Sequence, residues 1–144
     1  MQPIFFIILI GLAGGIAVGM QGPLSSVITQ KLGPFESVFI VHIGGAIAAL
    51  IPMLFVGSRL GQWKNLPWYA FSAGAFGLVV IMAVGYMIPR IGAAGAVVIL
   101  VTGQILISAV LDHFGLLGMA QRSLDLQRAI GVSVVILGVW LSVK

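Results

Sequence analysis

Long apolar runs, separated by short clusters of charged residues, dominate this 144-residue chain. Only 7% of the residues are charged, whereas a soluble domain carries about 25%. Seven Lys and Arg with three Asp and Glu could not solvate the surface of a soluble fold of this size. The pattern therefore predicts an all-α polytopic membrane protein, whose helices cross a lipid bilayer.

The apolar runs predict five transmembrane helices in a single membrane domain, residues 1–144. At 1.5 Å per residue, most of them can cross the hydrocarbon core of about 30 Å. The last segment is short, so we expect the flanking Arg128 and Lys144 to reach toward the headgroups. The five helices are expected at about residues 4–30, 35–56, 68–88, 91–111 and 129–143.

Several function classes are excluded by residue types. The chain has no cysteine, which removes disulfides and thiol chemistry. Its net charge of +4 does not indicate nucleic-acid binding, because the basic residues are spread along the chain and fall at predicted helix ends. There is no metal-ligand spacing, catalytic triad or phosphate loop, so we expect neither an enzyme nor a metal or cofactor site.

The distribution of basic residues gives almost no orientation signal. The predicted loops place Arg59, Lys64, Arg122 and Arg128 on one side and Lys31, Arg90 and Lys144 on the other, four against three. A clear imbalance is what fixes the orientation of a membrane protein. We therefore expect the chain to insert both ways round; a single orientation set by other features is the alternative.

The first predicted helix carries a proline and several polar residues near its end. Pro23 cannot donate a backbone hydrogen bond and crowds the carbonyl of Gly19. Freed backbone at membrane depth is tolerated only against protein or a watery cavity. The alternative is a helix that ends at Gln21, followed by a polar loop. We expect a hinge at Gly19, Gly22 and Pro23 and a cavity wall formed by Gln21, Ser25 and Ser26.

A polar stripe follows the fourth predicted helix. Gln104, Ser108 and Asp112 are spaced four residues apart, which puts them on one helix face. Gln104 lies about 20 Å from the helix start, well inside the membrane. Polar residues at that depth are expensive and mark functional sites by default. We expect Gln104 and Ser108 to line the substrate cavity; interhelical hydrogen bonding alone is the alternative.

Four ionisable residues are candidates for a proton carrier or gate: His42, Glu36, Asp112 and His113. Asp112 stands at a helix C-terminus, where the helix dipole disfavours a carboxylate, so His113 or a nearby arginine should compensate it. An interfacial cap is the alternative for Asp112. For His42 the alternative is a neutral histidine that hydrogen-bonds across the bundle.

Glycines recur on faces of several predicted helices, where small residues allow close helix contact in lipid. Packing within the bundle explains most of them. Gly131 and Gly138, seven residues apart on the last helix, are candidates for a subunit interface.

Together these motifs resemble the YdcZ family of small bacterial inner-membrane proteins, within the drug/metabolite transporter (EamA-like) superfamily. The resemblance covers essentially the whole chain, and its most specific part joins Gly103-Gln104 to the Asp-His-Phe-Gly sequence. The residues that carry it are Gln21-Gly22-Pro23-Leu24, Leu32-Gly33, Pro89 to Ala94, Gly103-Gln104 and Leu111 to Gly115.

The resemblance implies a five-helix half of a ten-helix transporter fold. It would be completed by an inverted copy of the chain, as an antiparallel homodimer, or by an oppositely inserted homologue. A small metabolite or drug would bind between the halves and cross the inner membrane by alternating access. Related four-helix multidrug transporters carry a membrane carboxylate roughly where Gln21 stands. Glutamine cannot carry a proton, so any proton coupling would have to use another residue. A non-transporting scaffold or regulatory subunit is the alternative function.

Overall fold

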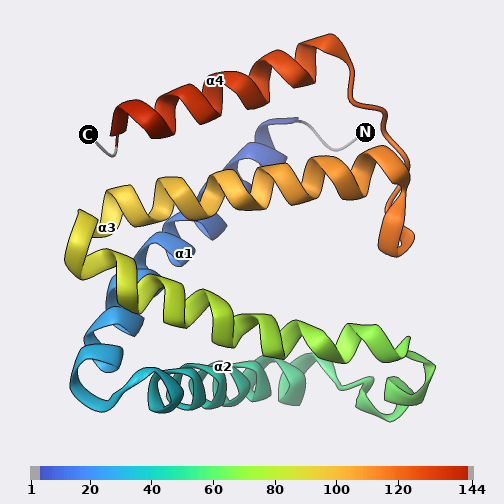
Figure 1. Cartoon of the computed structure of the whole chain (residues 1–144). Helices are drawn as coiled ribbons and strands as arrows, with labels where there is room; N and C mark the ends of the chain where they lie inside the picture. The colour runs from blue at the N-terminus through green and yellow to red at the C-terminus, as the bar shows by residue number, and fades with distance from the viewer. Residues whose placement is uncertain (1–3, 143–144) are drawn as a thin grey trace. The chain divides into compact units, whose positions relative to one another are not determined.

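The computed structural model describes residues 4–142, and the regular elements of this part are all helical, which confirms the all-α prediction. Four α-helices and three short 3-10 helices follow one another along the chain (Figure 1). The α-helices are α1 (Ile4–Leu32), α2 (Pro34–Val56), α3 (Ala73–Phe114) and α4 (Leu126–Ser142). The 3-10 helices are η1 (Leu60–Asn65), η2 (Trp68–Ser72) and η3 (Leu116–Gly118).

Three helical stretches within residues 4–142 are long and apolar enough to cross a membrane: α1, α2 and the 47 residues of η2 and α3, Trp68–Phe114. The last of these is about twice the length that one crossing needs. The apolar part of α4, Leu126–Leu141, is shorter than a usual span. Of the boundaries expected for the fifth helix, Val143 and the flanking Lys144 lie outside the described residues.

The chain divides into two compact units at Pro89 and Arg90, so α3 contributes to both. The N-terminal unit is described for residues 4–89 and the C-terminal unit for residues 90–142. Helical dihedral angles in α3 are interrupted at Gly92, with φ 75° and ψ 168°. The sequence pattern placed the break at Pro89-Arg90 instead. A proline can remain inside a helix at the loss of one hydrogen bond, whereas a positive φ favours glycine.

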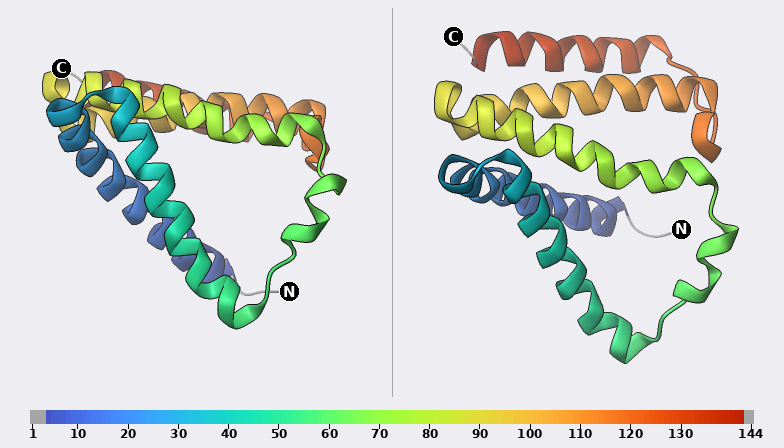
Figure 2. Two further views of the ribbon diagram at one scale, coloured as in Figure 1. Left: turned by 90° about the horizontal axis from the view of Figure 1, so that it is seen from below. Right: turned by 60° about the horizontal axis from the view of Figure 1, so that its bottom comes forward.

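A one-residue connection at Gly33 joins α1 to α2. Gly33 has φ 112°, its N–H donates to the carbonyl of Thr29 at 3.0 Å, and Pro34 begins α2. Proline suits this first helical position because its missing N–H would have had no partner there. The two helices are close together at this turn and separate along their lengths (Figure 2, right).

The buried residues of the N-terminal unit cluster near this turn. They are Ser25 and Ser26 of α1, Ser37 of α2, and Ile81 and Val84 of α3. The Ser37 hydroxyl donates to the carbonyl of Ser25 at 3.0 Å, so a hydrogen bond ties α1 to α2. Packing in lipid has no hydrophobic driving force of its own, so small residues and such bonds stabilise the contact.

Two glycines let α3 approach its neighbours within this unit. A Cβ built on Gly85 would lie 2.5 Å from Thr29 Cγ2, and one built on Gly77 would lie 2.5 Å from His42 Nε2. Real carbon atoms do not approach this closely, so both contacts depend on glycine. Gly85 thus receives a side chain of α1 and Gly77 receives one of α2.

The C-terminal unit consists of residues 90–114 of α3, a connection of eleven residues and α4, which runs back beside α3 (Figures 1 and 2). The connection begins with a sharp turn, in which Gly115, Leu117 and Gly118 have positive φ. The Arg122 N–H then donates to the carbonyl of Asp112 at 2.7 Å, which holds the connection against the end of α3. The Asp125 carboxylate accepts from the Arg128 N–H at 2.8 Å and so caps the start of α4.

Candidate functional site

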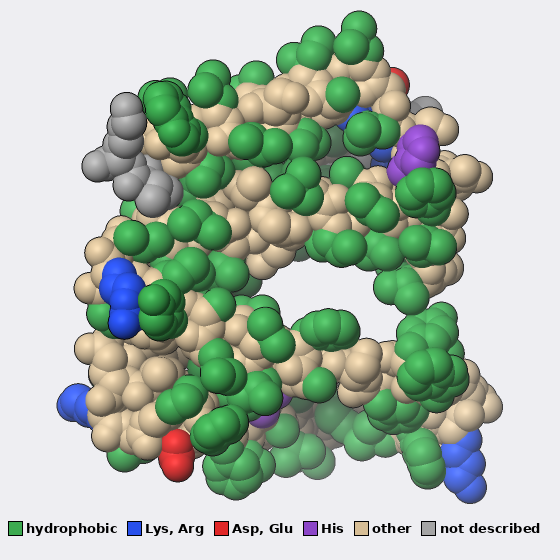
Figure 3. Space-filling model, in the orientation of Figure 1, with side chains coloured by type: hydrophobic (Ala, Val, Ile, Leu, Met, Phe, Trp, Pro, Cys, Tyr) green, Lys and Arg blue, Asp and Glu red, His purple; other side chains and the backbone are tan. Residues whose placement is uncertain are grey.

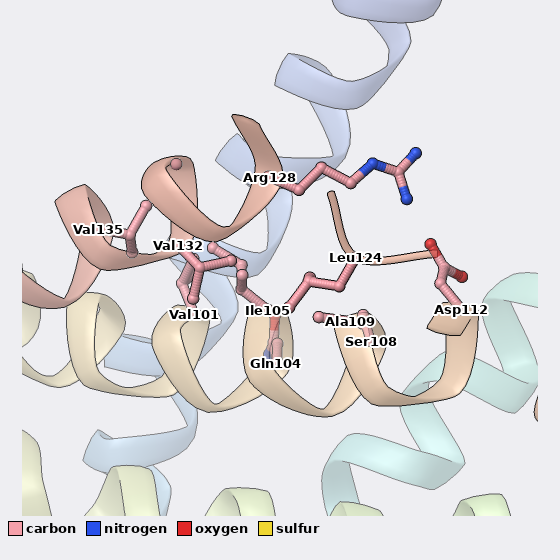
Figure 4. A pocket seen from close by; sticks show the side chains of 11 residues that line it. Val101, Gln104, Ile105, Ser108, Ala109, Asp112, Leu124, Arg128, Val132 and Val135 are labelled. Carbon is pink, nitrogen blue, oxygen red and sulfur yellow. The ribbon is translucent and has the colours of Figure 1, made fainter. Parts of the chain in front are cut away.

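The polar stripe of α3 lines a cavity within the C-terminal unit. Gln104, Ser108 and Asp112 stand along one side of it, as the four-residue spacing predicted, and α4 forms the other side (Figure 4). The volume of this α3–α4 cavity is about 670 Å³. Small-molecule sites in proteins commonly have volumes of about 300–1,000 Å³.

Most of the other residues that line the α3–α4 cavity are apolar, in keeping with a site for a mostly apolar molecule. The polar stripe is thus the main source of hydrogen-bonding groups on the α3 side. Gln104 contributes an amide with two donors and an acceptor, and Ser108 contributes a hydroxyl. The apolar walls are Val101, Ile105 and Ala109 of α3, Leu124 of the connection, and Val132 and Val135 of α4.

Two opposite charges stand at one end of the cavity. Asp112 is half-buried at the end of α3, and Arg128 projects from the first turn of α4 (Figure 4). The Arg128 guanidinium donates to the carbonyl of Arg122 at 3.4 Å, so the connection holds it near this end. The helix dipole disfavours a carboxylate at a helix C-terminus, and Arg128 places a cation in the same cavity as Asp112. Compensation of the Asp112 charge by Arg128 stays a prediction.

Residues 6–141 match the family described as "Putative inner membrane exporter, YdcZ". The chain belongs to the YdcZ family. It is therefore an inner-membrane protein of an exporter family, and the resemblance seen in its motifs is confirmed. No curated protein and no solved structure matches the chain.

In this YdcZ-family protein, α1 continues through Pro23 to Leu32, so the helix does not end at Gln21. Gln21 is exposed, and Gly22 faces Val84 and Ile88 of α3 in the N-terminal unit. The structure therefore excludes the polar-loop alternative for this segment. The hinge expected at Gly19, Gly22 and Pro23 stays a prediction.

Ser25 and Ser26, which were expected in a cavity wall, are almost completely buried, with 3% and 1% of their surface exposed. The Ser25 carbonyl accepts from Ser37, and the Ser26 hydroxyl accepts from the Gln30 amide at 3.0 Å. Neither serine lines the α3–α4 cavity. Within the N-terminal unit these groups join α1 to α2 and close a turn of α1.

The ionisable candidates have different surroundings. His42 is exposed, and its Nδ1 lies 2.8 Å from the carbonyl of Val38, which makes Nδ1 the protonated nitrogen and leaves Nε2 against Gly77. Glu36 is exposed in the first turn of α2, where the helix dipole favours a carboxylate. Of the four candidates, only Asp112 lines the α3–α4 cavity.

His113 holds the connection between α3 and α4. Its Nδ1 accepts from the Leu124 N–H at 3.0 Å, so Nδ1 carries no proton in this structure, and its carbonyl accepts from the Gln121 amide at 3.2 Å. These bonds stabilise the turn behind Asp112. A gating role for His113 stays a prediction.

Sequence reasoning missed two features of this YdcZ-family protein. Arg128 was interpreted as an anchor at the membrane surface, but it also lines the cavity that holds Asp112. Two features of the sequence could have indicated this position: the charge of Arg128 is opposite to that of Asp112, and Arg128 lies at the start of the next helix after Asp112. Gly131, interpreted as a candidate for a subunit interface, lines the same cavity and so faces α3 of its own chain.

Within residues 4–142, no three His, Asp or Glu residues lie close enough together to hold a metal ion.

Proposed function

We propose that this chain exports a small molecule across the inner membrane and that the molecule binds in the α3–α4 cavity. The observation that carries the proposal is the polar stripe of Gln104, Ser108 and Asp112 beside a cavity of about 670 Å³. Thr102, one face away on the same helix, donates its hydroxyl to the carbonyl of Val98 at 2.9 Å and does not line the cavity. Polar side chains are costly inside a membrane. Where they face a cavity between two helices rather than a neighbouring side chain, binding of a ligand explains them better than contact between the helices.

The finer mechanism is part of the same proposal. Residues 73–91 and 93–114 of α3 act as two spans, which with α1, α2 and α4 make the five-helix half of a ten-helix fold. Two copies inserted in opposite directions complete the fold as an antiparallel homodimer. Gly138 is the remaining glycine candidate for a contact between them, since Gly131 lines the α3–α4 cavity. The four-against-three division of basic residues supports this arrangement.

Alternating access would expose the cavity first to one side of the membrane and then to the other. Gly19, Gly22 and Pro23 would supply flexibility in α1. Gln21, Ser25 and Ser26 would belong to the polar segment of α1 that moves when this helix bends. Asp112 is the leading candidate for a proton carrier, because it is the ionisable candidate that lines the cavity.

Replacing Gln104 by leucine tests the binding site, because it keeps the side-chain size and removes the amide. Thr102→Val, on the same helix but outside the cavity, is the matched control. Metabolites released into the medium by cells that express each variant would be compared by mass spectrometry. We expect Gln104→Leu to remove the compounds whose release depends on the wild-type protein, while Thr102→Val keeps them. Normal release by Gln104→Leu at equal membrane abundance would disprove this binding site, and no protein-dependent release by the wild type would favour a non-transporting subunit.

Insertion in both orientations can be measured separately. The chain has no cysteine, so Lys144→Cys introduces a single reporter. Intact cells would first be labelled with an impermeant thiol reagent. The cells would then be permeabilised, and the protein that had not reacted would be labelled in a second step. We expect comparable labelled and protected fractions. A single orientation would contradict the antiparallel homodimer and leave an oppositely inserted homologue as the partner.

A further inference from the structure

A second cavity lies in the connection between α2 and α3, far along the N-terminal unit from the Gly33 turn. The connection leaves α2 at Gly57 and forms the two 3-10 helices η1 and η2 before α3 begins. Its cavity has a volume of about 490 Å³. Its polar walls are Ser58, Arg59, Gln62 and Asn65, and its apolar walls include Met53 and Trp63. We call it the 57–66 cavity.

The charges around the 57–66 cavity favour an anionic ligand. Residues 57–72 contain Arg59 and Lys64 and no Asp or Glu. The acidic residue of the N-terminal unit is Glu36, in the first turn of α2, whereas the cavity begins at the other end of that helix. About twenty residues of helix separate the two, or about 30 Å, so Glu36 cannot neutralise Arg59.

Hydrogen-bond donors are available in the same place. The Ser58 hydroxyl oxygen accepts from the Leu60 N–H at 3.2 Å, which leaves its own proton free to be donated. Arg59 offers a guanidinium, and the amides of Gln62 and Asn65 offer N–H groups. Lys64 Nζ lies 6.0 Å from the ring centre of Trp63, which places its charge beside an aromatic wall of the cavity. A guanidinium with several neutral donors suits a phosphate group.

The apolar side of the 57–66 cavity distinguishes a lipid from free phosphate. Met53 lines the cavity from the last turn of α2, and the neighbouring Leu54, Phe55 and Val56 are more than 80% exposed. Figure 3 shows basic side-chain atoms next to hydrophobic surface at this end of the N-terminal unit, at the lower right. Trp63, Trp68 and Tyr69 lie in the same connection, and Trp and Tyr are enriched at the depth of the membrane interface. A phosphate in the cavity would therefore have apolar helix surface directly below it for acyl chains.

We propose that the 57–66 cavity binds the phosphate headgroup of an anionic phospholipid, whose acyl chains lie along the end of α2. Arg59 provides the main charge contact, and Lys64 strengthens it. The site is independent of the proposed export function, because none of its residues lines the α3–α4 cavity.

Tryptophan fluorescence can test this site on the purified full-length protein. In a Trp68→Phe, Trp140→Phe background, Trp63 is the only remaining tryptophan, because the chain has three. Brominated phosphatidylglycerol and brominated phosphatidylcholine would be titrated separately in mild detergent, with quenching of Trp63 as the readout. We expect phosphatidylglycerol to bind at least about fivefold more tightly, since one basic residue near an anionic lipid contributes about that factor.

Arg59→Gln should remove most of this preference, and Lys64→Gln should reduce it. Arg122→Gln, which removes a basic residue from the connection of the other unit, is the matched control and should keep it. Using both Arg59→Gln and Lys64→Gln keeps the test decisive if one of them fails to fold. Equal affinity for the two lipids, or an unchanged preference in both variants, would overturn the proposal. Competition by inorganic phosphate, but not by chloride at equal ionic strength, would show that the site takes free phosphate and would overturn the lipid assignment.

Discussion

The two units of this chain use polar side chains in different ways. In the N-terminal unit, Ser25, Ser26 and Ser37 are buried, and a serine hydroxyl joins α1 to α2. In the C-terminal unit, Gln104 and Ser108 are exposed along a cavity. Polar residues in membrane helices therefore do not have one meaning, and their partners decide between helix association and ligand binding. The N-terminal unit should be sensitive to substitution through its stability, and the C-terminal unit through its activity.

The largest stability effect is expected at Gly85. A valine there would place its Cβ against the β-branched Thr29, whose side chain has few rotamers in a helix. We expect Gly85→Val to lower the free energy of unfolding by about 3 kcal/mol, as overpacking of a tight contact does. Gly44→Val is the matched control, because a Cβ there meets nothing within 4 Å. Equal destabilisation of the two variants, measured by unfolding in mixed detergent micelles, would show that the contact between α1 and α3 is not tight.

A smaller effect with the opposite sign is expected at Thr29. Its hydroxyl oxygen is buried and has no hydrogen-bond partner among the described residues, and the Ser25 carbonyl one turn earlier already accepts from Ser37. Thr29→Val keeps the shape and removes the unsatisfied group. We expect it to raise the free energy of unfolding by about 1–2 kcal/mol. A loss of stability in the same unfolding assay would mean that the hydroxyl has a partner in the membrane.

The smallest stability effect is expected for serine to alanine substitutions. They compare the two units directly, because the same substitution can be made in both. Ser37→Ala removes the bond to the Ser25 carbonyl and should cost about 0.6–1 kcal/mol. Ser108→Ala should change the free energy of unfolding by less than about 0.5 kcal/mol, because Ser108 is exposed, but it should reduce export. If Ser108→Ala destabilised the protein as much as Ser37→Ala and left export unchanged, the distinction between the two units would fail.

The length of apolar runs and the spacing of polar residues made much of this structure predictable. The apolar runs anticipated α1 and α2 closely, since both are long and end near Gly33 and Gly57. The four-residue spacing of Gln104, Ser108 and Asp112 placed them on one face, because a helix turns through 3.6 residues. These features depend only on local sequence.

Contacts between distant residues could not be predicted in the same way. The burial of Ser25 and Ser26 depends on where α2 turns back at Gly33, and the part of Arg128 in the cavity depends on the course of the connection after Gly115. The break in α3 was expected at the proline, but a helix can accommodate Pro89, and the positive φ of Gly92 is a property of the folded backbone. Such features depend on tertiary structure rather than on residue spacing.

The break at Gly92 also has a consequence for biosynthesis. The Ser37–Ser25 bond and the contacts of Gly77 and Gly85 all lie between residues 25 and 85, upstream of the break. Chains are synthesised from the N-terminus and tend to fold in that order. The N-terminal unit can thus complete its internal contacts while the ribosome is still translating α4. The cavity of the C-terminal unit would then be the last part of the protein to form in the membrane.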